Sequence, residues 1–395
     1  MIKSKLLRAP GLLLSSLLWT ALPAGLAAAS DDSPSASQLL LLIQNQQREL
    51  DKLKAALAKT QAAKTEKTTS DGPLSSLDQK FSFGGVVEIE ATKSEDFASA
   101  ESSDITLATV ELFVDAELSD LVSTHVQFLY EDDGDDIIRL DEGFVTLGNT
   151  ERHPPYLQAG KWVVPFGNFN TDMSSDPLTL DLGETKEAAV LFGVASDGFT
   201  LEGFVYNGDT QQANDNDEIE QGGLAFGYGT EIMGGRVNLG ASYVRNIADS
   251  DSLTTGLAAA ARALDRLVGG IEGHAALSLQ SWTLRGSYMT AAKAFRATEL
   301  AFNGRGAKPK AWHLEAAYST SINGQDVTVA ATAQNTGEAL ALGLPERRYG
   351  TAVTLGVLEH AAITAEYLRD NDYCIGDGGT GNDGYTATLK LAVEF

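Results

Sequence analysis

The last eleven residues of the chain alternate between two kinds of side chain. Apolar or aromatic side chains occupy every second position, and the positions between them are mostly polar. The first set is Tyr385, Ala387, Leu389, Leu391, Val393 and Phe395, and the second includes Thr386, Thr388, Lys390 and Glu394. A two-residue period predicts a strand with one apolar and one wet face. With an aromatic final residue, it is typical of the closing strand of an outer-membrane β-barrel, whose faces meet lipid and a watery lumen.

Residues 1–29 have the composition of a cleaved secretory signal. A positively charged start precedes an apolar stretch from about 12 to 22, and small residues follow before Ser30. Pro23 and Gly25 leave the apolar part shorter than the ~20 residues that a membrane-spanning helix needs. The sequence therefore predicts export of the chain and removal of this segment.

Charge and motif content exclude several classes of function. The formal net charge is −25, whereas binding to nucleic acid requires a basic surface. The single cysteine, Cys374, excludes an internal disulfide. GxSxG, HExxH and glycine-rich phosphate motifs are missing from the sequence, and its five histidines are scattered. We therefore expect no enzyme, no catalytic residues, no resident cofactor and no nucleic-acid partner.

A helix is predicted at residues 38–63, between polar linkers at 30–37 and 64–80. Its apolar residues follow a 3,4 spacing over about three heptads, with Gln46 at the one polar position of the seam. The apolar set is Leu39, Ile43, Leu50, Leu53 and Leu57. We expect a periplasmic coiled coil that holds a homo-oligomer, with a trimer as the leading assembly. A short amphipathic helix lying on another surface is the alternative.

Residues 81–395 show period-two alternation interrupted by turn signals. The predicted strands begin near 81, 105, 122, 138, 156, 187, 198, 222, 235, 268, 281, 310, 326, 348, 360 and 384. Tight turns alternate with long polar loops, as in outer-membrane barrels with short periplasmic turns and long external loops. The sequence thus predicts an all-β, 16-stranded antiparallel transmembrane barrel with both termini in the periplasm.

The same alternation predicts which side chains line the lumen. Polar residues opposite in parity to the lipid-facing set are Glu88, Glu90, His125, Gln127, Glu202, Asn238, Glu272, His274, Arg285, His313, Glu315 and Glu366. For each of them the simplest interpretation is a solvated wall. Such a wall can discriminate between solutes without a dedicated ligand-binding residue.

The loop from Pro165 to Lys186 is far longer than a hairpin needs, and it is the third external loop. We expect it to fold into the lumen as a constriction, with a cover over the barrel mouth as the alternative. Four carboxylates would then line the substrate path opposite Lys186, namely Asp172, Asp176, Asp181 and Glu184. Parity places Lys161 on the outer face, and only a bulge at Gly160 would turn it inward.

The stretch 157–194 resembles the LbtU family of siderophore porins. The shared motifs are Gly160 and Lys161, the PFG turn at 165–167, the DPLT segment at 176–179 and the GET segment at 183–185. The FVTLGN strand end at 144–149, the GF strand start at 198–199 and the YNGD segment at 206–209 also agree. The resemblance implies an unplugged outer-membrane channel that admits a ferric siderophore.

Other functions stay open at the level of sequence. One is a general or selective porin for small hydrophilic solutes such as sugars, phosphate or cations, and another is a barrel that anchors and organises the envelope. Acidic runs at 131–136 and 214–220 raise the possibility of Ca²⁺ in external loops near lipopolysaccharide, although neither run has the full spacing of a calcium loop. A further helix is predicted at 254–267.

Deletion of residues 38–60 is expected to leave a folded, heat-resistant barrel but to lower its oligomeric state. The physical reason is that the heptad seam lies outside the predicted membrane-embedded part. Crosslinking of intact outer membranes measures the assembly size. An unchanged size would show that the helix does not hold the oligomer together.

Overall fold

The computed structural model describes residues 80–395 apart from 133–136, 151–152, 215, 217 and 258–262. The predicted signal peptide and coiled helix, and nearly all of the two linkers, lie outside the described residues. The main strands are β1 (Phe81–Glu95), β2 (Glu101–Ser119), β3 (Val122–Glu131), β4 (Arg139–Leu147), β5 (Pro155–Val163), β6 (Lys186–Ser196), β7 (Phe199–Tyr206), β9 (Gln221–Ile232), β10 (Gly235–Val244), β12 (Gly270–Leu279), β13 (Trp282–Ala291), β16 (Lys310–Ile322), β17 (Gln325–Gly337), β18 (Arg347–Leu358), β19 (Ala361–Asn371) and β20 (Asp383–Glu394).

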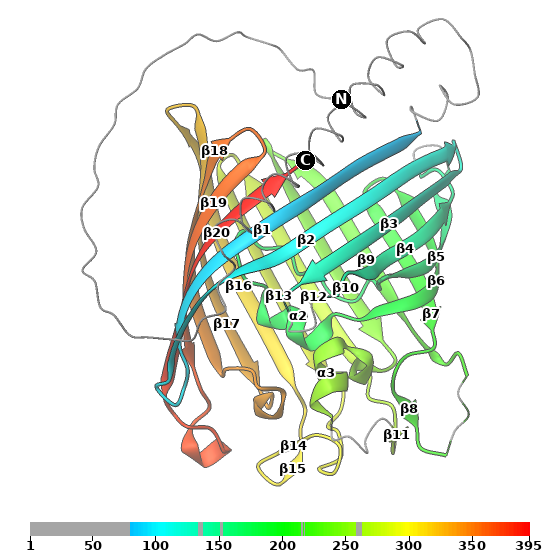
Figure 1. Ribbon diagram of the computed structural model, residues 1–395. Coiled ribbons are helices and arrows are strands. Elements are labelled where there is room, and N and C mark those ends of the chain that lie inside the picture. Colours follow the sequence, from blue (N-terminus) through cyan, green and yellow to red (C-terminus); the bar gives the residue numbers. More distant parts are fainter. Residues whose placement is uncertain (1–79, 133–136, 151–152, 215, 217, 258–262) are drawn as a thin grey trace, which may run out of the picture. The chain divides into compact units, whose positions relative to one another are not determined.

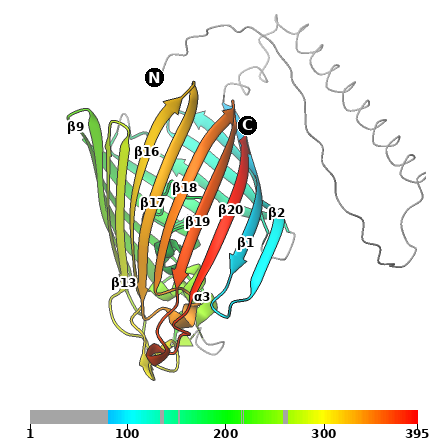
Figure 2. The ribbon, with the colours of Figure 1, turned by 90° about the vertical axis from the view of Figure 1, so that its left-hand side faces the viewer.

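These sixteen strands form one closed antiparallel barrel, and each strand pairs with its neighbours along the chain. The barrel closes between the first and last strands, where Val86 pairs with Glu394 and Glu95 pairs with Tyr385 (Figures 1 and 2). The predicted fold class is therefore confirmed. The largest difference from the predicted strand starts is at β2, which begins at Glu101 rather than near 105.

The long loops contain short elements that the alternation did not predict. They are β8 (Gln211–Gln212), β11 (Ala263–Leu264), β14 (Ala301–Phe302), β15 (Arg305–Gly306), the helices α2 (Leu178–Gly183) and α3 (Asp251–Gly256), and the 3₁₀ turns η1 (Ile247–Asp249), η2 (Leu340–Leu342) and η3 (Ile375–Asp377). The helix predicted at 254–267 is wrong in its extent, because α3 ends at Gly256 and residues 263–264 pair with β8. Each helix in the described residues is too short or too polar to cross a bilayer.

The outer face of the barrel is apolar and exposed. On β6, Val190 and Phe192 are 47% and 56% exposed, whereas Leu191 between them is 3% exposed. Aromatic pairs lie on this face beside the short turns, where outer-membrane barrels carry aromatic girdles. The ring centroids are 4.4 Å apart in the pair Phe199–Tyr228 and 4.9 Å apart in the pair Trp282–Tyr318.

The long loops pack on one another around a second apolar core. Leu182 on α2, Ile247 on η1 and Leu253 on α3 are each 0% exposed and belong to one buried cluster. The two helices are in contact and lie at the long-loop end of the barrel (Figure 1). Burial therefore holds α2, η1 and α3 together, whereas β8, β11, β14 and β15 extend beyond the ends of the barrel strands (Figure 1).

Removal of Phe395 is expected to reduce the amount of assembled barrel severalfold. Its backbone N–H and C=O each bond to Gly85 at 3.1 Å, and its ring is 64% exposed at the end of the outer-face stripe. Deletion removes both backbone bonds at the closure and an interfacial aromatic anchor. Heat-modifiable mobility of outer-membrane fractions measures assembly, and Phe395→Tyr is the control that keeps bonds and ring. Normal levels of a chain ending at Glu394 would contradict this role.

Candidate functional site

The loop at 164–185 crosses the lumen of the barrel. It leaves β5 and returns to β6, and in the closed strand order these two strands lie opposite β17 and β18. Its helix α2 contacts β13, β16 and β17 and is seen inside the barrel in Figure 1. Each contact joins segments more than a hundred residues apart in sequence, for example Leu178 and Gln334. The loop therefore spans the lumen from wall to wall.

Glu315 on β16 anchors the first part of this crossing loop. Its Oε1 accepts a hydrogen bond of 2.9 Å from the Asp172 backbone N–H, and its Oε2 accepts one from the Thr171 hydroxyl. Arg285 on β13 donates through Nη1 to Glu315 at 2.6 Å and also to the Asp172 carboxylate. A carboxylate buried to 4% exposure is thus compensated by several donors, as a buried charge requires.

Glu366 on β19 anchors the middle of the loop. The backbone N–H groups of Ser174 and Ser175 donate to its Oε2 at 2.7 and 3.2 Å, and the Ser175 hydroxyl donates to Oε1. Next in the chain, the Leu178 N–H donates to Gln334 Oε1 at 2.7 Å. Because Pro177 precedes α2 and carries no N–H, the wall amide satisfies the first free donor of that helix.

Apolar contacts complete the attachment. Leu178 and Leu182 of α2 are 0% exposed, and Met173 packs in a cluster with Ala317, Ala330, Ala352 and Leu368 of the barrel wall. Small alanines on the wall leave room for the loop side chains. Both apolar and polar groups of the loop therefore contact the barrel wall.

The four loop carboxylates lie in separate surroundings. Asp172 pairs with Arg285. Asp176 is an exposed residue near Lys390, Glu88 and Glu366. Partial desolvation of its carboxylate raises the pKa of Asp176. Burial raises the pKa of Asp181 to about 6, an effect that Arg348 opposes.

Glu184 and Lys186 lie at the end of the loop. Burial raises the pKa of Glu184 to about 7, so that near neutral pH it carries only part of its charge, and Lys186 opposes this rise. Lys186 Nζ donates to Asp141 on β4 at 2.6 Å. The four predicted carboxylates and Lys186 therefore do not gather at one point of the lumen.

The wall residues that touch the loop identify the inward face, and register extends this face around the barrel. For example, Gly227, Gly240, His274, Ser287, His313 and Gln334 form one continuous row of cross-strand partners. All of the predicted lining positions fall on this face: Glu88, Glu90, His125, Gln127, Glu202, Asn238, Glu272, His274, Arg285, His313, Glu315 and Glu366. Whether they meet a solute stays a prediction.

Lys161 is on the outward face. The pairings of β5 with β4 and β6 run without a register shift, and Lys161 pairs with Gly143 and Ala188. Gly160 has a φ of +147°, but it does not interrupt the alternation of the strand. The bulge that would turn Lys161 inward is therefore missing from this strand.

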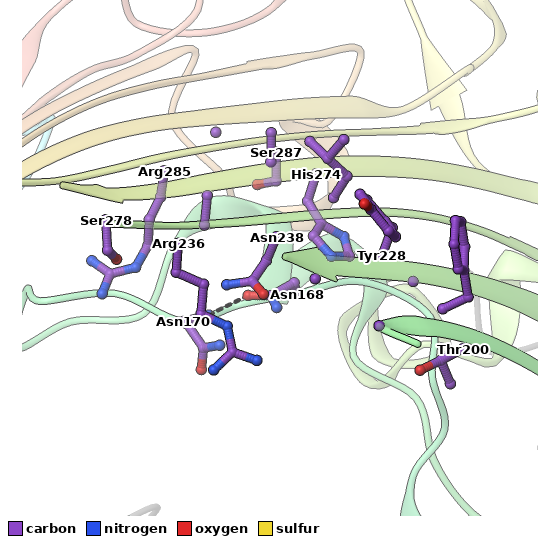
Figure 3. A pocket seen from close by; sticks show the side chains of 18 of the residues that line it. Asn168, Asn170, Thr200, Tyr228, Arg236, Asn238, His274, Ser278, Arg285 and Ser287 are labelled. Carbon is purple, nitrogen blue, oxygen red and sulfur yellow. Dashed lines mark hydrogen bonds between the residues drawn. The ribbon is translucent and has the colours of Figure 1, made fainter. Parts of the chain in front are cut away.

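A polar cavity of about 840 Å³ lies beside the crossing loop (Figure 3). Its polar lining comes from the loop and from β7, β9, β10, β12, β13 and β16, and includes Asn168, Asn170, Thr200, Arg236, Asn238, His274, Ser278, Arg285, Ser287 and His313. Asp172, Asp176, Asp181 and Glu184 are not among the lining residues. The cavity is therefore lined mainly by amides, hydroxyls, imidazoles and guanidinium groups.

The sequence prediction missed six of these residues, namely Asn168, Asn170, Thr200, Arg236, Ser278 and Ser287. Arg236 has the same parity as Asn238 on β10, so the alternation contained the signal for it. The two asparagines are in the loop, where no period applies, and the Asn170 N–H donates to Asn168 Oδ1 at 3.2 Å. Only the path of the loop through the barrel brings them to the cavity.

The acidic runs considered for Ca²⁺ are only partly described, because residues 133–136, 215 and 217 lie outside the described part. Within the described residues, His, Cys, Asp and Glu form no group of three or more that could hold a metal ion. A calcium site in the external loops stays an untested prediction.

No protein-family profile matches the chain. A UPF0422 protein of Legionella pneumophila strain Lens is 29% identical over 355 residues, which cover 80% of this chain and 66% of that protein. A UPF0422 protein of Coxiella burnetii is 26% identical over 301 residues, which cover 74% of this chain and 64% of that protein. The chain thus spans just under two thirds of the length of these relatives, and their names state no substrate.

Solved structures show the same fold. The outer-membrane channel DcaP of Acinetobacter baumannii has a TM-score of 0.55 at 11% identity, covering 80% of this chain and 97% of that one. OprB of Pseudomonas putida has a TM-score of 0.54 at 11% identity, covering 80% and 95%. An anion-selective porin from Comamonas acidovorans has a TM-score of 0.53 at 12% identity, covering 80% and 99%. The chain therefore has the barrel fold of outer-membrane porins.

Glu366→Ala is expected to release the crossing loop while the barrel stays closed. It removes the acceptor of two backbone N–H groups and one hydroxyl, and a hydrogen bond to a charged group contributes about 1.5–3 kcal/mol. Hydrogen exchange of the Ser174 and Ser175 amides should accelerate about tenfold or more. The control is Glu359→Ala at a short turn, whose side chain is 92% exposed. Unchanged exchange in the Glu366 variant would show that this anchor does not hold the loop.

Proposed function

We propose that the chain is a passive diffusion channel of the bacterial outer membrane, with selectivity set where the loop at 164–185 crosses the lumen. The observation that carries this proposal is the loop itself, which is bonded to Glu315 and Glu366 on the opposite wall and leaves a polar cavity beside it. A sixteen-stranded barrel is wide enough to hold an aqueous channel. A loop across it reduces the cross-section that a solute can use.

The exposed apolar outer face and the aromatic pairs beside the short turns support a place in the outer membrane, beside lipopolysaccharide. Short turns at one end and long loops at the other support an orientation with both termini in the periplasm. A homo-oligomer held by the helix at 38–63 is part of this proposal.

For the substrate we propose a ferric siderophore. The resemblance to the LbtU family is concentrated in the residues that build the crossing loop. Pro177 and Leu178 of the DPLT segment start α2 against Gln334, and Thr185 of the GET segment donates to the Gly183 carbonyl at the end of α2. The shared motifs thus belong to the segment most able to decide what passes.

A general or selective porin for small hydrophilic solutes such as sugars, phosphate or cations is the second candidate. The specific observation in its favour is the polar cavity, which at 840 Å³ is within the size range of small-molecule sites. An envelope anchor without transport is the third. Single-channel recording of the purified protein in planar bilayers separates these functions, because a stable conducting channel supports the first two and a silent barrel supports the third.

Deletion of residues 166–185 is expected to raise single-channel conductance and to weaken discrimination among large solutes. The strands β5 and β6 are adjacent, so a short linker closes the gap at little entropic cost. Conductance in KCl and the relative rates of uptake of sugars of increasing size into liposomes measure the effect. Unchanged conductance would place the constriction in the mouth loops instead.

Removal of the whole gene is expected to abolish siderophore-dependent growth of iron-limited cells, whereas removal of the coiled segment alone should preserve it. The reason is that transport would depend on the barrel and its loop, and the helix would affect only assembly. Growth curves with ferric siderophore as the sole iron source test this. Normal growth of the strain that lacks the gene would reject the siderophore as the substrate, but it would not contradict the proposed channel function.

A further inference from the structure

The crossing loop lies between two parts of the inward wall. On one side lie β20 and β1 to β4, where carboxylates such as Glu88, Glu90, Asp115 and Glu142 face the lumen. On the other side lie β7 to β13, which form the cavity shown in Figure 3. The two sides therefore offer different surroundings to a charged solute.

Several hydrogen-bond donors that line the cavity have no partner among the described residues. Arg236 is exposed, and within the described part of the chain its guanidinium group makes no ion pair or hydrogen bond. The side-chain amides of Asn170 and Asn238 donate no hydrogen bond to another described residue. Asn168 uses only its oxygen, as the acceptor of the Asn170 N–H. A guanidinium group and three amides are thus available to a ligand.

The carboxylates on this side are already occupied or lie at its edge. Glu272 accepts hydrogen bonds from Ser242 and His274, each at 2.8 Å, and Glu315 pairs with Arg285 at 2.6 Å. Asp197 lies at the rim, in a short turn, and accepts from Ser196. Glu231 is the cross-strand partner of Arg236, but the two side chains form no ion pair. Among the residues that line the cavity, Arg236 is therefore the cationic group without a described ion-pair partner, and Asp197 at the rim is the carboxylate without one.

Missing side chains create the space in front of these donors. Gly229 on β9 pairs with Asn238, and Gly227 is the next inward residue of the same strand. A Cβ on Gly229 would lie 2.9 Å from Asn238 Oδ1 and 3.6 Å from Arg236 Nη2. The glycines therefore leave the guanidinium and amide groups open from the lumen.

We propose that this cavity binds the oxyanion group of a solute in transit, with Arg236 as the residue that contacts it. The guanidinium plane offers two parallel N–H groups to a carboxylate or phosphate, and the amides of Asn168, Asn170 and Asn238 supply further donors. The inference rests on the proposed channel function, to which it adds the chemical class of solute. The site selects oxyanions through local contacts, although the chain as a whole has a strongly negative net charge.

The test is block of the potassium chloride current through the full-length protein in planar bilayers. Citrate and inorganic phosphate are the oxyanion probes, sucrose is the neutral probe and Tris is the cationic probe. We expect citrate, phosphate or both to block the wild-type channel, and Arg236→Gln to raise the concentration for half block about tenfold or more, since a hydrogen bond to a charged group is lost. The matched control is Arg305→Gln, the same charge change at a side chain that is 70% exposed on the β14–β15 hairpin.

A second variant tests the site without changing charge. Gly227→Val fills the cavity, and it should fold because φ is ordinary there and the nearest atom to an added Cβ is Thr200 Cβ at 3.6 Å. It should weaken oxyanion block while sucrose exclusion changes little. Equal block of wild type, Arg236→Gln and Gly227→Val, or block by Tris alone, would overturn the site while the channel function stands. A silent wild-type barrel would instead reject the channel function itself.

Discussion

Pairing of the first strand with the last is the interaction on which the rest of the structure depends. Hydrocarbon offers no partner to a free N–H or C=O, so a sheet in a bilayer is stable only when it has no edge. Ten residue pairs from Val86–Glu394 to Glu95–Tyr385 remove that edge. Closure also fixes the register of all sixteen strands, and register decides which side chains face the lumen. The composition of the inward face therefore follows from a backbone constraint.

Within this wall, two buried carboxylates hold the loop that crosses the lumen. Glu315 and Glu366 are 4% exposed each, and burial without partners would be costly for both. The loop supplies backbone N–H groups and hydroxyls that satisfy them, and Arg285 adds a positive charge at Glu315. The attachment is mutual, since these loop amides would otherwise lack acceptors. A rigid loop held in this way divides the inward wall into an acidic side and a side with unpaired donors.

Much of the barrel could be predicted because alternation is a local property that each strand repeats. The alternation identified the strands and the inward set that runs from Glu88 to Glu366. Arg236 has the same parity, although it was not among the predicted lining residues. The short strands β8 and β11 could not be predicted, since Gln211 pairs in parallel with Ala263 across two long loops. The surroundings of the four loop carboxylates could not be predicted either, because each of those side chains meets a different part of the wall.

The division between the two kinds of information has a physical reason. The side-chain period, the turn residues and the terminal aromatic are local features of the sequence. They suffice to specify a closed barrel with an apolar outside and a polar inside. The partners of the loop are 143 residues away at Glu315 and 192 residues away at Glu366. Nothing local distinguishes these glutamates from the other inward ones. Only the folded barrel, which brings the loop to the opposite wall, decides which charges are paired and which stay free to meet a solute.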